Sequence, residues 1–223
     1  MLVIFDLDGT LLNTISDLAE AANYALEKAG FPVHSPAAYP YFVGNGVTRL
    51  LERVLPEDER TDANVKLLRE YFTDYYGSHL TCHTEPYRGI HELLRQLRDN
   101  DIAVAVASNK YQEAVTRLIT HYFPDIDWAV VAGQREGVPV KPDPSIVFGI
   151  LMVCPTPKSQ VLYVGDSGVD MVTARRAAVT SVGVTWGFRG EQELRNNFAD
   201  HIVSDPEGIL HLALEMKDGV ELS

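Results

Sequence analysis

The sequence predicts an α/β protein with a doubly wound, Rossmann-like parallel sheet and an α-helical cap domain inserted after the first strand. Short apolar runs of strand length alternate with helical patterns over most of the chain, as in βαβ units. These runs are continuously apolar, which is typical of strands covered on both faces of a parallel sheet. One long stretch near the amino terminus carries helical patterns without a strand, which indicates an inserted helical unit.

Five apolar runs are the expected strands of the sheet, at residues 2–5, 102–107, 128–131, 161–164 and 181–185. Helical patterns lie between them, at residues 90–97, 114–119 and 146–152. Since consecutive parallel strands are joined by helices that pack back onto the sheet, this order predicts helices on its faces.

The helical insert is expected to span residues 15–84, leaving residues 1–14 and 85–223 as the core domain. Its first helix has an apolar stripe, with Asn13 or Thr14 as the N-cap and Gly30 as the stop signal. Further apolar stripes run through residues 47–55 and 65–76, and hinges are expected near residues 13–14 and 84–86. Members of the first stripe are Ile15, Leu18, Ala19, Ala22, Ala25, Leu26 and Ala29.

Composition and charge exclude several classes of function. The chain has 223 residues, 46% of them hydrophobic and 22% charged, which supports a full hydrophobic core. A formal net charge of −12 repels phosphate backbones, so we expect no nucleic-acid partner. The sequence shows no membrane-spanning run, signal peptide or zinc-type cysteine spacing. We therefore expect a cytoplasmic protein without a membrane partner, and nothing in the sequence specifies an oligomeric state.

Two aspartates follow the first expected strand, in the segment Asp6-Leu7-Asp8-Gly9-Thr10. Side chains two residues apart on a strand face the same side, so these carboxylates repel each other unless a cation lies between them. The alternative is a simple Asp-Gly turn at the end of the strand. A calcium-binding loop is excluded, because it requires an acid or amide where Thr10 stands and a glycine where Leu11 stands.

Polar residues also follow the later strands. Ser108 and Asn109 come after the second strand, where a serine is commonly just a helix cap. Lys141 lies in the segment Val-Lys-Pro-Asp-Pro, in which Asp143 suits an N-cap for a helix that begins at Pro144. A single lysine in a loop is most often a solvated charge.

The fourth polar segment, Gly165-Asp166-Ser167-Gly168-Val169-Asp170, leads from a strand into a helix. Its glycines and the helix amino terminus suit a phosphate or a metal-bound carboxylate, although acids in a first turn also complement the helix dipole. A serine-hydrolase elbow is excluded, because Val169 stands where the second glycine is required. Open α/β sheets bind ligands at the carboxyl ends of their strands, so all four segments are expected at one site.

Taken together and in this order, the segments resemble the motifs of the haloacid dehalogenase superfamily of phosphotransferases. The matching patterns are Asp-x-Asp-Gly-Thr, Ser-Asn, Lys-Pro and Gly-Asp-x-x-x-Asp, and the helical insert stands where that family carries its cap. Residues 42–46 (Phe-Val-Gly-Asn-Gly) and 184–188 (Val-Thr-Trp-Gly-Phe) resemble the phosphoglycolate phosphatase branch of the superfamily.

The resemblance implies a phosphatase that hydrolyses a small phosphate monoester, 2-phosphoglycolate or a similar metabolite, through an aspartyl-phosphate intermediate. It implies Mg²⁺ held by the carboxylates of Asp6 and Asp166 and by the backbone carbonyl of Asp8. Asp6 is then the nucleophile, and Asp8 protonates the leaving group and later deprotonates water.

The resemblance also implies roles around the phosphoryl group and in the cap. Lys141 and Ser108 are expected to hold phosphoryl oxygens, and Asp170 is expected to orient Lys141 or metal-bound water. Thr10 and Asn109 are expected beside the substrate. In the cap, Asn45 and its flanking glycines are expected to contact a small carboxylate, whereas the four-residue spacing of Arg49 and Arg53 places both on a solvated helix face.

Other functions remain open at this point. A β-phosphoglucomutase-like mutase or a pyrophosphatase would use the same scaffold. A receiver-like signalling domain also combines acids, a hydroxyl and a lysine at strand ends, but it is much shorter and has no helical insert. A catalytically inactive binding scaffold is disfavoured, because every catalytic residue type is present.

Overall fold

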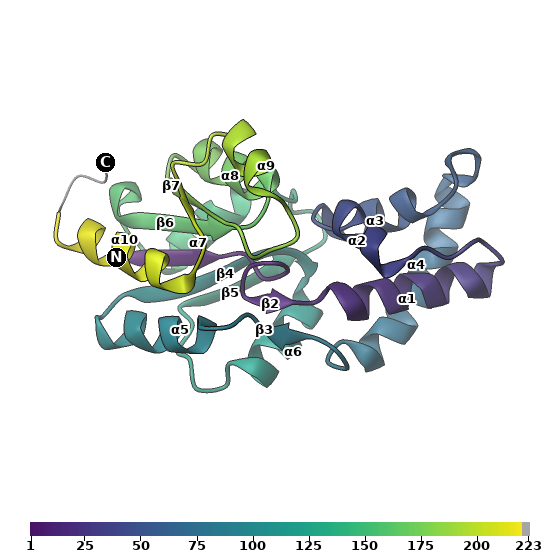
Figure 1. Cartoon of the computed structure of the whole chain (residues 1–223), viewed down its shortest axis with the longest axis horizontal. Coiled ribbons are helices and arrows are strands. Elements are labelled where there is room, and N and C mark those ends of the chain that lie inside the picture. The colour runs from purple at the N-terminus through teal and green to yellow at the C-terminus, as the bar shows by residue number, and fades with distance from the viewer. Residues whose placement is uncertain (220–223) are drawn as a thin grey trace.

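A six-stranded parallel sheet forms the centre of the core in the computed structural model, which describes residues 1–219 (Figure 1). In spatial order its strands are β5 (Val130–Gln134), β4 (Ala103–Tyr111), β1 (Leu2–Phe5), β6 (Val161–Gly165), β7 (Thr180–Val184) and β8 (His201–Val203). Every pair of neighbours is parallel. The predicted parallel sheet is confirmed, and only the short, half-buried edge strand β8 was not predicted.

The strand order places the ends of β1 and β6 at the point where the winding of the sheet reverses. Numbered along the chain, the six strands lie in the order 3-2-1-4-5-6, and ligands of such sheets bind outside the carboxyl ends at this reversal. Phe5 lies opposite Val164, and the amide of Asp6 donates to the carbonyl oxygen of Val164 at 2.8 Å. Asp6 and Asp166 therefore leave the sheet side by side.

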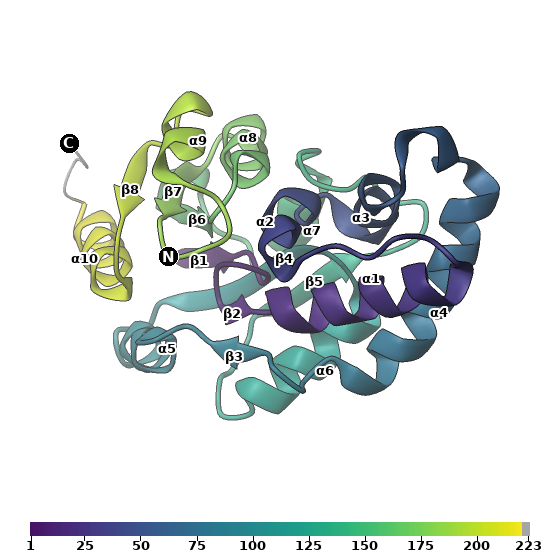
Figure 2. The same cartoon turned by 45° about the vertical axis from the view of Figure 1, so that its right-hand side comes forward.

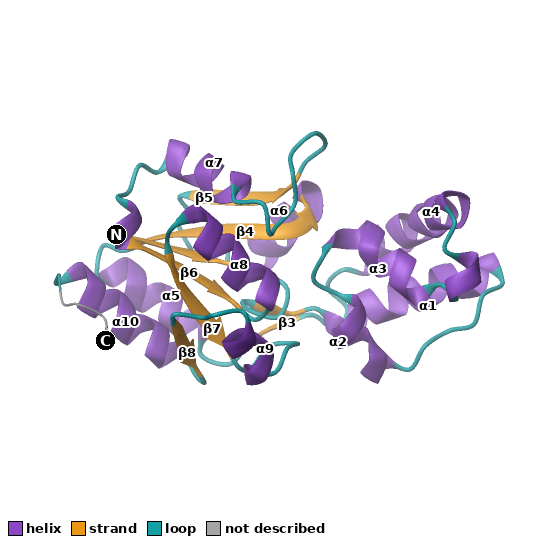
Figure 3. Cartoon of the chain, turned by 90° about the horizontal axis from the view of Figure 1, so that it is seen from above, coloured by secondary structure: helices purple, strands orange, loops and turns teal. Residues whose placement is uncertain are grey.

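Helices cover both faces of the sheet (Figures 1 and 3). The helices α5 (Ile90–Asp99), α6 (Gln112–Tyr122) and α10 (Pro206–Lys217) pack on one face, and α7 (Ser145–Val153), α8 (Gly168–Ala177) and α9 (Glu191–Asn196) pack on the other. Within β1, Val3 and Phe5 join one apolar core while Leu2 and Ile4 join the second. This two-sided burial is the physical reason that the strands are continuously apolar.

A bundle of helices lies beside the sheet and contains no strand between its first and last helix (Figure 3). It consists of α1 (Ile15–Ala29), α2 (Tyr39–Phe42), α3 (Gly46–Val54) and α4 (Asp62–His79), with 3-10 turns at Pro36–Ala38 and Glu57–Glu59. Helix α1 packs along α4 (Figure 2) and ends at Gly30, whose φ of 80° is left-handed. Helix α2 was not predicted, because it is four residues long and contains Pro40.

Both connections between the core and the bundle run through a two-stranded ribbon. Strand β2 (Leu12–Asn13) pairs antiparallel with β3 (Glu85–Pro86), so the chain enters and leaves the bundle at adjacent points (Figure 2). The buried carboxylate of Asp17 on α1 accepts hydrogen bonds from the amides of His83 at 2.8 Å and Thr84 at 2.9 Å. The expected hinge positions thus fall on this ribbon.

Candidate active site

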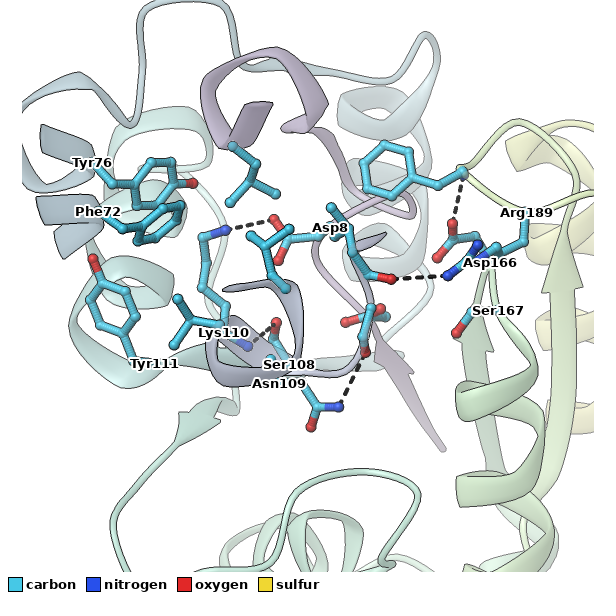
Figure 4. Close-up of a pocket in the computed structure, with 18 residues that line it drawn as sticks. Asp8, Phe72, Tyr76, Ser108, Asn109, Lys110, Tyr111, Asp166, Ser167 and Arg189 are labelled. Atoms are coloured by element: carbon cyan, nitrogen blue, oxygen red, sulfur yellow. Dashed lines mark hydrogen bonds and ion pairs between the residues drawn. The ribbon is translucent and has the colours of Figure 1, made fainter. Parts of the chain in front are cut away.

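A cavity lies between the carboxyl edge of the sheet and the helical bundle (Figure 4). The core supplies most of its charged and polar side chains, including Asp6, Asp8, Ser108, Lys110 and Asp166. The bundle supplies a largely apolar wall, made of Leu18, Val43, Val47, Leu50, Phe72 and Tyr76 together with Gly44 and Gly46. One end of the cavity is therefore charged and the other is aromatic and aliphatic.

Asp6 is the first residue after β1 and is almost completely buried. Its Oδ1 accepts a hydrogen bond from the amide of Leu7 at 2.7 Å and lies 2.9 Å from Nζ of Lys141. Burial raises the pKa of Asp6 to about 7, although the ammonium of Lys141 acts in the opposite direction. Asp6 is thus a carboxylate whose charge depends on nearby cations.

Lys141 is a buried cation, so its interpretation as a solvated loop lysine is wrong. Its Nζ lies 2.7 Å from Oδ1 of Asp170 and donates to the carbonyl oxygen of Ala107 at 3.0 Å, in addition to its contact with Asp6. Burial acts to lower the pKa of Lys141, but Asp170 and Asp6 outweigh it and hold that pKa well above its usual value. The lysine stays charged and bridges two carboxylates.

Asn109 holds the backbone of Lys141 in place. The Lys141 amide donates to Oδ1 of Asn109 at 2.8 Å, and Nδ2 of Asn109 donates to the Lys141 carbonyl oxygen at 3.1 Å and to that of Gly44 at 3.3 Å. The carboxamide of Asn109 is thereby engaged on both sides. It positions Lys141 and contacts the bundle, and the side chain also lines the cavity, so its expected contact with the substrate stays a prediction.

Asp166 and Asp170 complete a cluster of three buried carboxylates with Asp6. Oxygen atoms of the three lie within 4.8 Å of one another, and Asp166 also accepts from the amide of Phe188 at 2.7 Å. Burial raises the pKa of Asp166 well above its usual value, and the neighbouring Asp170 and Asp6 add to this effect. Of the three carboxylates, Asp6 and Asp170 form ion pairs with Lys141.

The donor set fits a divalent cation. Three buried carboxylates carry more negative charge than one lysine offsets, and hard oxygen donors are those that Mg²⁺ prefers. Ser167, just before α8, holds Asp170 in place. The Oγ of Ser167 donates to Oδ2 of Asp170 at 2.6 Å, and the amide of Ser167 donates to the same oxygen at 3.2 Å. Since Asp170 already faces Lys141, the expected interaction between these two residues is present.

Two glycines pack against the Asp166 side chain. A Cβ atom built on Gly187 would collide with the Asp166 side chain and with the carbonyl oxygen of Gly9, and one built on Gly9 would collide with Asp166 as well. Gly9 also has a φ of +88°, which disfavours other residues. The segment 184–188 resembles the family, but nothing in the sequence indicates why residue 187 is a glycine, because the contact joins the loop after β7 to the turn after β1.

We expect the Gly187→Ala variant to lose about 2–3 kcal/mol of unfolding free energy, because overpacking forces neighbouring groups to shift. Urea unfolding at neutral pH measures this loss. Gly190→Ala in the same loop is the matched control, since its Cβ would meet nothing within 4 Å, and it should stay close to the parent. Equal unfolding free energies for the two variants would show that the Asp166 pocket tolerates a methyl group.

Asp8 and Asp6 each have their own lysine. Oδ1 of Asp8 accepts a hydrogen bond from Nζ of Lys110 at 2.8 Å and another from Oγ1 of Thr14 at 2.6 Å. The expected repulsion between the two aspartates is thus relieved by two cations and not by a single one between them. Both aspartates line the cavity, as their position after β1 predicts.

Thr10, which is expected beside the substrate, is not among the residues that line the cavity, and its contact with a substrate stays a prediction. It is fully buried, and its Oγ1 has no hydrogen-bond partner among the described residues. Its carbonyl oxygen accepts from Nε1 of Trp186 at 3.1 Å. The role of Thr10 in this structure is therefore in the packing of the turn after β1.

Ser108 lies within β4, which continues to Tyr111, and α6 begins only at Gln112. Its interpretation as a helix cap is therefore wrong. The side chain is buried at the cavity wall, and its Oγ accepts from the amide of Lys110 at 3.1 Å. Because Ser108 lines the same cavity as Asp6, its position is compatible with the expected contact to a phosphoryl oxygen.

In the bundle, Asn45 does not line the cavity, although the glycines on either side of it do. Its Oδ1 accepts from Nη2 of Arg53 at 2.7 Å, and Nη1 of Arg53 donates to the carbonyl oxygen of Phe42 at 3.0 Å. The solvated position expected for Arg53 is wrong, because the segment before α3 folds back over this guanidinium and leaves it half-buried. Arg49 is exposed, as expected.

Several charged or polar side chains of the cavity were missed, among them Lys110, Tyr76 and Arg189. Lys110 and Tyr76 are buried and lie close together, with Nζ of Lys110 4.9 Å from the centre of the Tyr76 ring. Arg189 reaches from the core to the bundle, where its Nη2 donates to the carbonyl oxygen of Val43 at 3.0 Å. Lys110 directly follows Ser108 and Asn109, and a predicted strand that continued beyond residue 107 would have included it. No local sequence pattern marks Tyr76 or Arg189 as a residue of the cavity.

Comparison with known proteins agrees with this geometry. Residues 3–184 match a family model described as haloacid dehalogenase-like hydrolase. Phosphoglycolate phosphatase of Agrobacterium fabrum is 34% identical over 84% of this chain and 81% of its own, and that of Haemophilus influenzae is 29% identical over 92% of this chain and 94% of its own.

Solved structures show the same arrangement of the chain. A crystal structure from Lactobacillus delbrueckii subsp. bulgaricus superposes with a TM-score of 0.89 at 31% identity, covering 95% of this chain and 97% of that one. A structure described as a predicted phosphoglycolate phosphatase from Haemophilus somnus gives a TM-score of 0.86 at 28% identity, covering 95% of this chain and 96% of that one.

Proposed function

Because the chain belongs to the haloacid dehalogenase-like hydrolase family, we propose that it hydrolyses a small phosphate monoester, with Asp6 as nucleophile and Mg²⁺ as cofactor. The observation that carries the proposal is the arrangement of Asp6. Its carboxylate lies at the wall of a small cavity, bridged by Lys141 to Asp170 and clustered with Asp166. The names of the relatives point to 2-phosphoglycolate or a similar ester as the substrate.

In the proposed reaction, a carboxylate oxygen of Asp6 bonds to phosphorus while the bond from phosphorus to the ester oxygen breaks. The departing oxygen takes a proton from Asp8, and the phosphoryl group stays on Asp6. A water molecule then attacks the phosphorus, Asp8 accepts its proton, and Asp6 is released with inorganic phosphate. In this proposal Lys141 and Ser108 contact the phosphoryl oxygens, where charge accumulates.

Asp6 and Asp166, with Asp170 beside them, are the carboxylates that would hold the cation, and the backbone carbonyl of Asp8 is proposed as a further ligand. When bound, the ion would neutralise the clustered acids and the charge on the phosphoryl group. The buried carboxylates themselves support this assignment, because burial and mutual repulsion disfavour their ionised forms.

The test is a panel of phosphate esters assayed for phosphate release with Mg²⁺ and with EDTA. The expected result is Mg²⁺-dependent release from small esters, with 2-phosphoglycolate among the best. Interconversion of sugar phosphates with little release would instead identify a mutase, and preference for pyrophosphate a pyrophosphatase. A protein that takes up phosphate on an aspartate without turnover would fit a receiver-like function.

Addition of Mg²⁺ is expected to raise the melting temperature more at about pH 8 than at about pH 5.5. The pKa of Asp6 is raised to about 7 in the fold. Without metal, the free energy of unfolding therefore falls as the pH rises and Asp6 becomes ionised. A bound cation stabilises the ionised carboxylate and so offsets this loss of stability. At a hundred times Kd the gain is about 2.7 kcal/mol, or roughly 5–10 °C for a chain of this size. The pH dependence is read by thermal unfolding, with Asp166→Asn as the control that should lose most of the shift. Equal shifts at both pH values would place the metal elsewhere.

We further propose that residues 15–84 act as a cap domain over the phosphoryl site, since this segment supplies the apolar wall of the cavity. Excluding water during the first step would protect the aspartyl phosphate. Among residues 1–219, no helix has the length and apolarity needed to cross a bilayer. The small phosphorylated metabolite is the expected partner, and the cytoplasmic location stays a prediction.

A further inference from the structure

Lys110 connects the catalytic end of the cavity to its apolar end. It lies near the end of β4 and is buried, with Nζ 2.8 Å from Oδ1 of Asp8 and 4.9 Å from the centre of the Tyr76 ring. In Figure 4 its side chain runs between Asp8 and the group of rings formed by Phe72, Tyr76 and Tyr111. The proposed reaction uses Asp8 but gives no role to Lys110.

The apolar end of the cavity contains an unused hydrogen-bonding group. The hydroxyl of Tyr76 is buried and has no hydrogen-bond partner among residues 1–219, whereas buried hydroxyls are normally paired. The bundle side of the same cavity is lined by Leu18, Leu50 and Phe72, and the Phe72 ring stacks on Tyr76 with 5.2 Å between the ring centres. A buried hydroxyl beside an ammonium group suits one small anionic group, because an anion can accept from both donors.

Asp8 is not free for its proposed task in this arrangement. Its Oδ1 already accepts hydrogen bonds from Lys110 and from Oγ1 of Thr14, at 2.8 and 2.6 Å. A general acid must reach the departing oxygen, whereas Oδ1 of Asp8 is held by these two donors instead. The contact with Lys110 therefore opposes the first step for as long as it lasts.

We propose that Lys110 and Tyr76 bind a carboxylate at the far end of the leaving group, and that this binding draws Lys110 away from Asp8 and releases Asp8 for proton transfer. The freed Asp8 takes up a proton by exchange with the bulk solvent, gives it to the ester oxygen, and recovers one from the attacking water in the second step. This inference rests on the proposed function and adds to it a coupling between recognition of the leaving group and the chemical step.

The local structure permits this motion. The amide of Lys110 is fixed by Oγ of Ser108 at 3.1 Å, so the backbone stays in β4 while the flexible four-carbon stem moves the ammonium group. Among the described residues, the cavity lining contains one other cation, Arg189. Its guanidinium is already engaged by the carbonyl oxygen of Val43 at 3.0 Å and by Glu193 at 3.8 Å.

The first experiment compares two phosphate esters of equal length, 2-phosphoglycolate and 2-hydroxyethyl phosphate. The second ester has an uncharged alcohol group in place of the carboxylate. Since a charged hydrogen-bonding site discriminates strongly against a ligand that lacks the charge, we expect wild-type kcat/KM to favour the carboxylate by at least about 100-fold. In Lys110→Met this ratio should fall below about 10. The ratio is taken within one variant, so a general loss of active protein cancels.

Two further variants guard against misfolding. Tyr76→Phe removes a single oxygen atom and should raise KM for 2-phosphoglycolate while changing 2-hydroxyethyl phosphate little. Lys28→Met is the matched control, because Lys28 also lies over a tyrosine ring, at 5.6 Å from the centre of Tyr24, but is exposed on the bundle surface. It should keep the wild-type ratio.

The coupling itself is tested with two separate compounds, acetate and methyl phosphate, which carry the carboxylate and the phosphate ester of the substrate. Acetate added at constant ionic strength should accelerate hydrolysis of methyl phosphate by the wild-type protein, since it can draw Lys110 from Asp8, and should have no such effect on Lys110→Met. Sodium chloride is the ionic control. A lysine with a purely structural role would give no acceleration by acetate in either protein.

The outcomes separate this inference from the proposed function. If the wild-type protein releases phosphate from both esters at similar rates, or if Lys110→Met keeps the full preference for the carboxylate, the anion subsite is wrong and the phosphatase stands. If selectivity depends on Lys110 but acetate never activates, the coupling to Asp8 is overturned. If no ester is hydrolysed with Mg²⁺, the proposed function itself fails.

Discussion

Replacement of Asp6 by asparagine should lower kcat for phosphate release by at least about 10⁴-fold, because the amide cannot form the phosphoryl-enzyme intermediate. The change preserves the shape of the side chain. Asp6 is buried with a pKa raised to about 7, so above this pH removing its charge should leave the metal-free protein at least as stable as the parent. Loss of activity with retained stability distinguishes a chemical role from a structural one.

The measurement is phosphate release with 2-phosphoglycolate and Mg²⁺, together with thermal unfolding of the same sample. An Asp99→Asn variant is the control, since Asp99 is exposed on α5 and pairs only with its neighbour Arg98 at 3.0 Å. Asp6→Asn activity within about tenfold of the parent would be incompatible with a covalent intermediate on Asp6.

The Lys141→Met variant should show the largest loss of stability, about 3–5 kcal/mol at neutral pH, as expected when one partner of a buried ion pair is removed. Lys141 contacts Asp6 at 2.9 Å and Asp170 at 2.7 Å, and only 2% of its side chain is exposed. Without it, two carboxylates face each other in a buried site. Activity should fall as well, because the phosphoryl oxygens lose the nearest cation.

The loss should be smaller at about pH 5 than at about pH 8, because protonation can then neutralise the unpaired carboxylates. Asp6 already has a pKa near 7, and Lys141 acts to lower it, so removing the lysine favours the neutral acid further. Urea unfolding at the two pH values measures this difference, with Lys158→Met as a surface control. Adding Asp170→Asn to Lys141→Met should recover part of the stability, and a loss independent of pH would argue against the buried-charge explanation.

The parallel sheet and the convergence of the main motifs could be predicted from the sequence for one physical reason. Continuous apolar runs specify strands buried on both faces, and the carboxyl ends of parallel strands meet at one edge. Asp6, Ser108 and Asp166 therefore had to lie together, and the structure brings Lys141 to them through Asn109. The resemblance to the haloacid dehalogenase superfamily is likewise confirmed.

The residues that escaped prediction depend on contacts between distant segments. Tyr76 reaches Lys110 from the helical bundle and has no local signature. Gly187 lies in a segment that resembles the family, but its contact with the side chain of Asp166 is visible only in the structure. Arg53 is half-buried because residues before α3 fold back onto it. Thr10 belongs to a recognisable motif, but only the structure shows that it is fully buried and does not belong to the cavity lining.

The ribbon formed by β2 and β3 has a consequence for how such enzymes diversify. Because the chain enters and leaves the helical bundle at adjacent points of this ribbon, the whole bundle is attached to the core at one place. Its length and sequence can drift, or be exchanged for those of another protein, without altering the spacing of Asp6 and Asp166. Exchange of the segment between residues 13 and 85 would thus change the apolar wall of the cavity, while the core residues proposed for phosphoryl transfer stay the same.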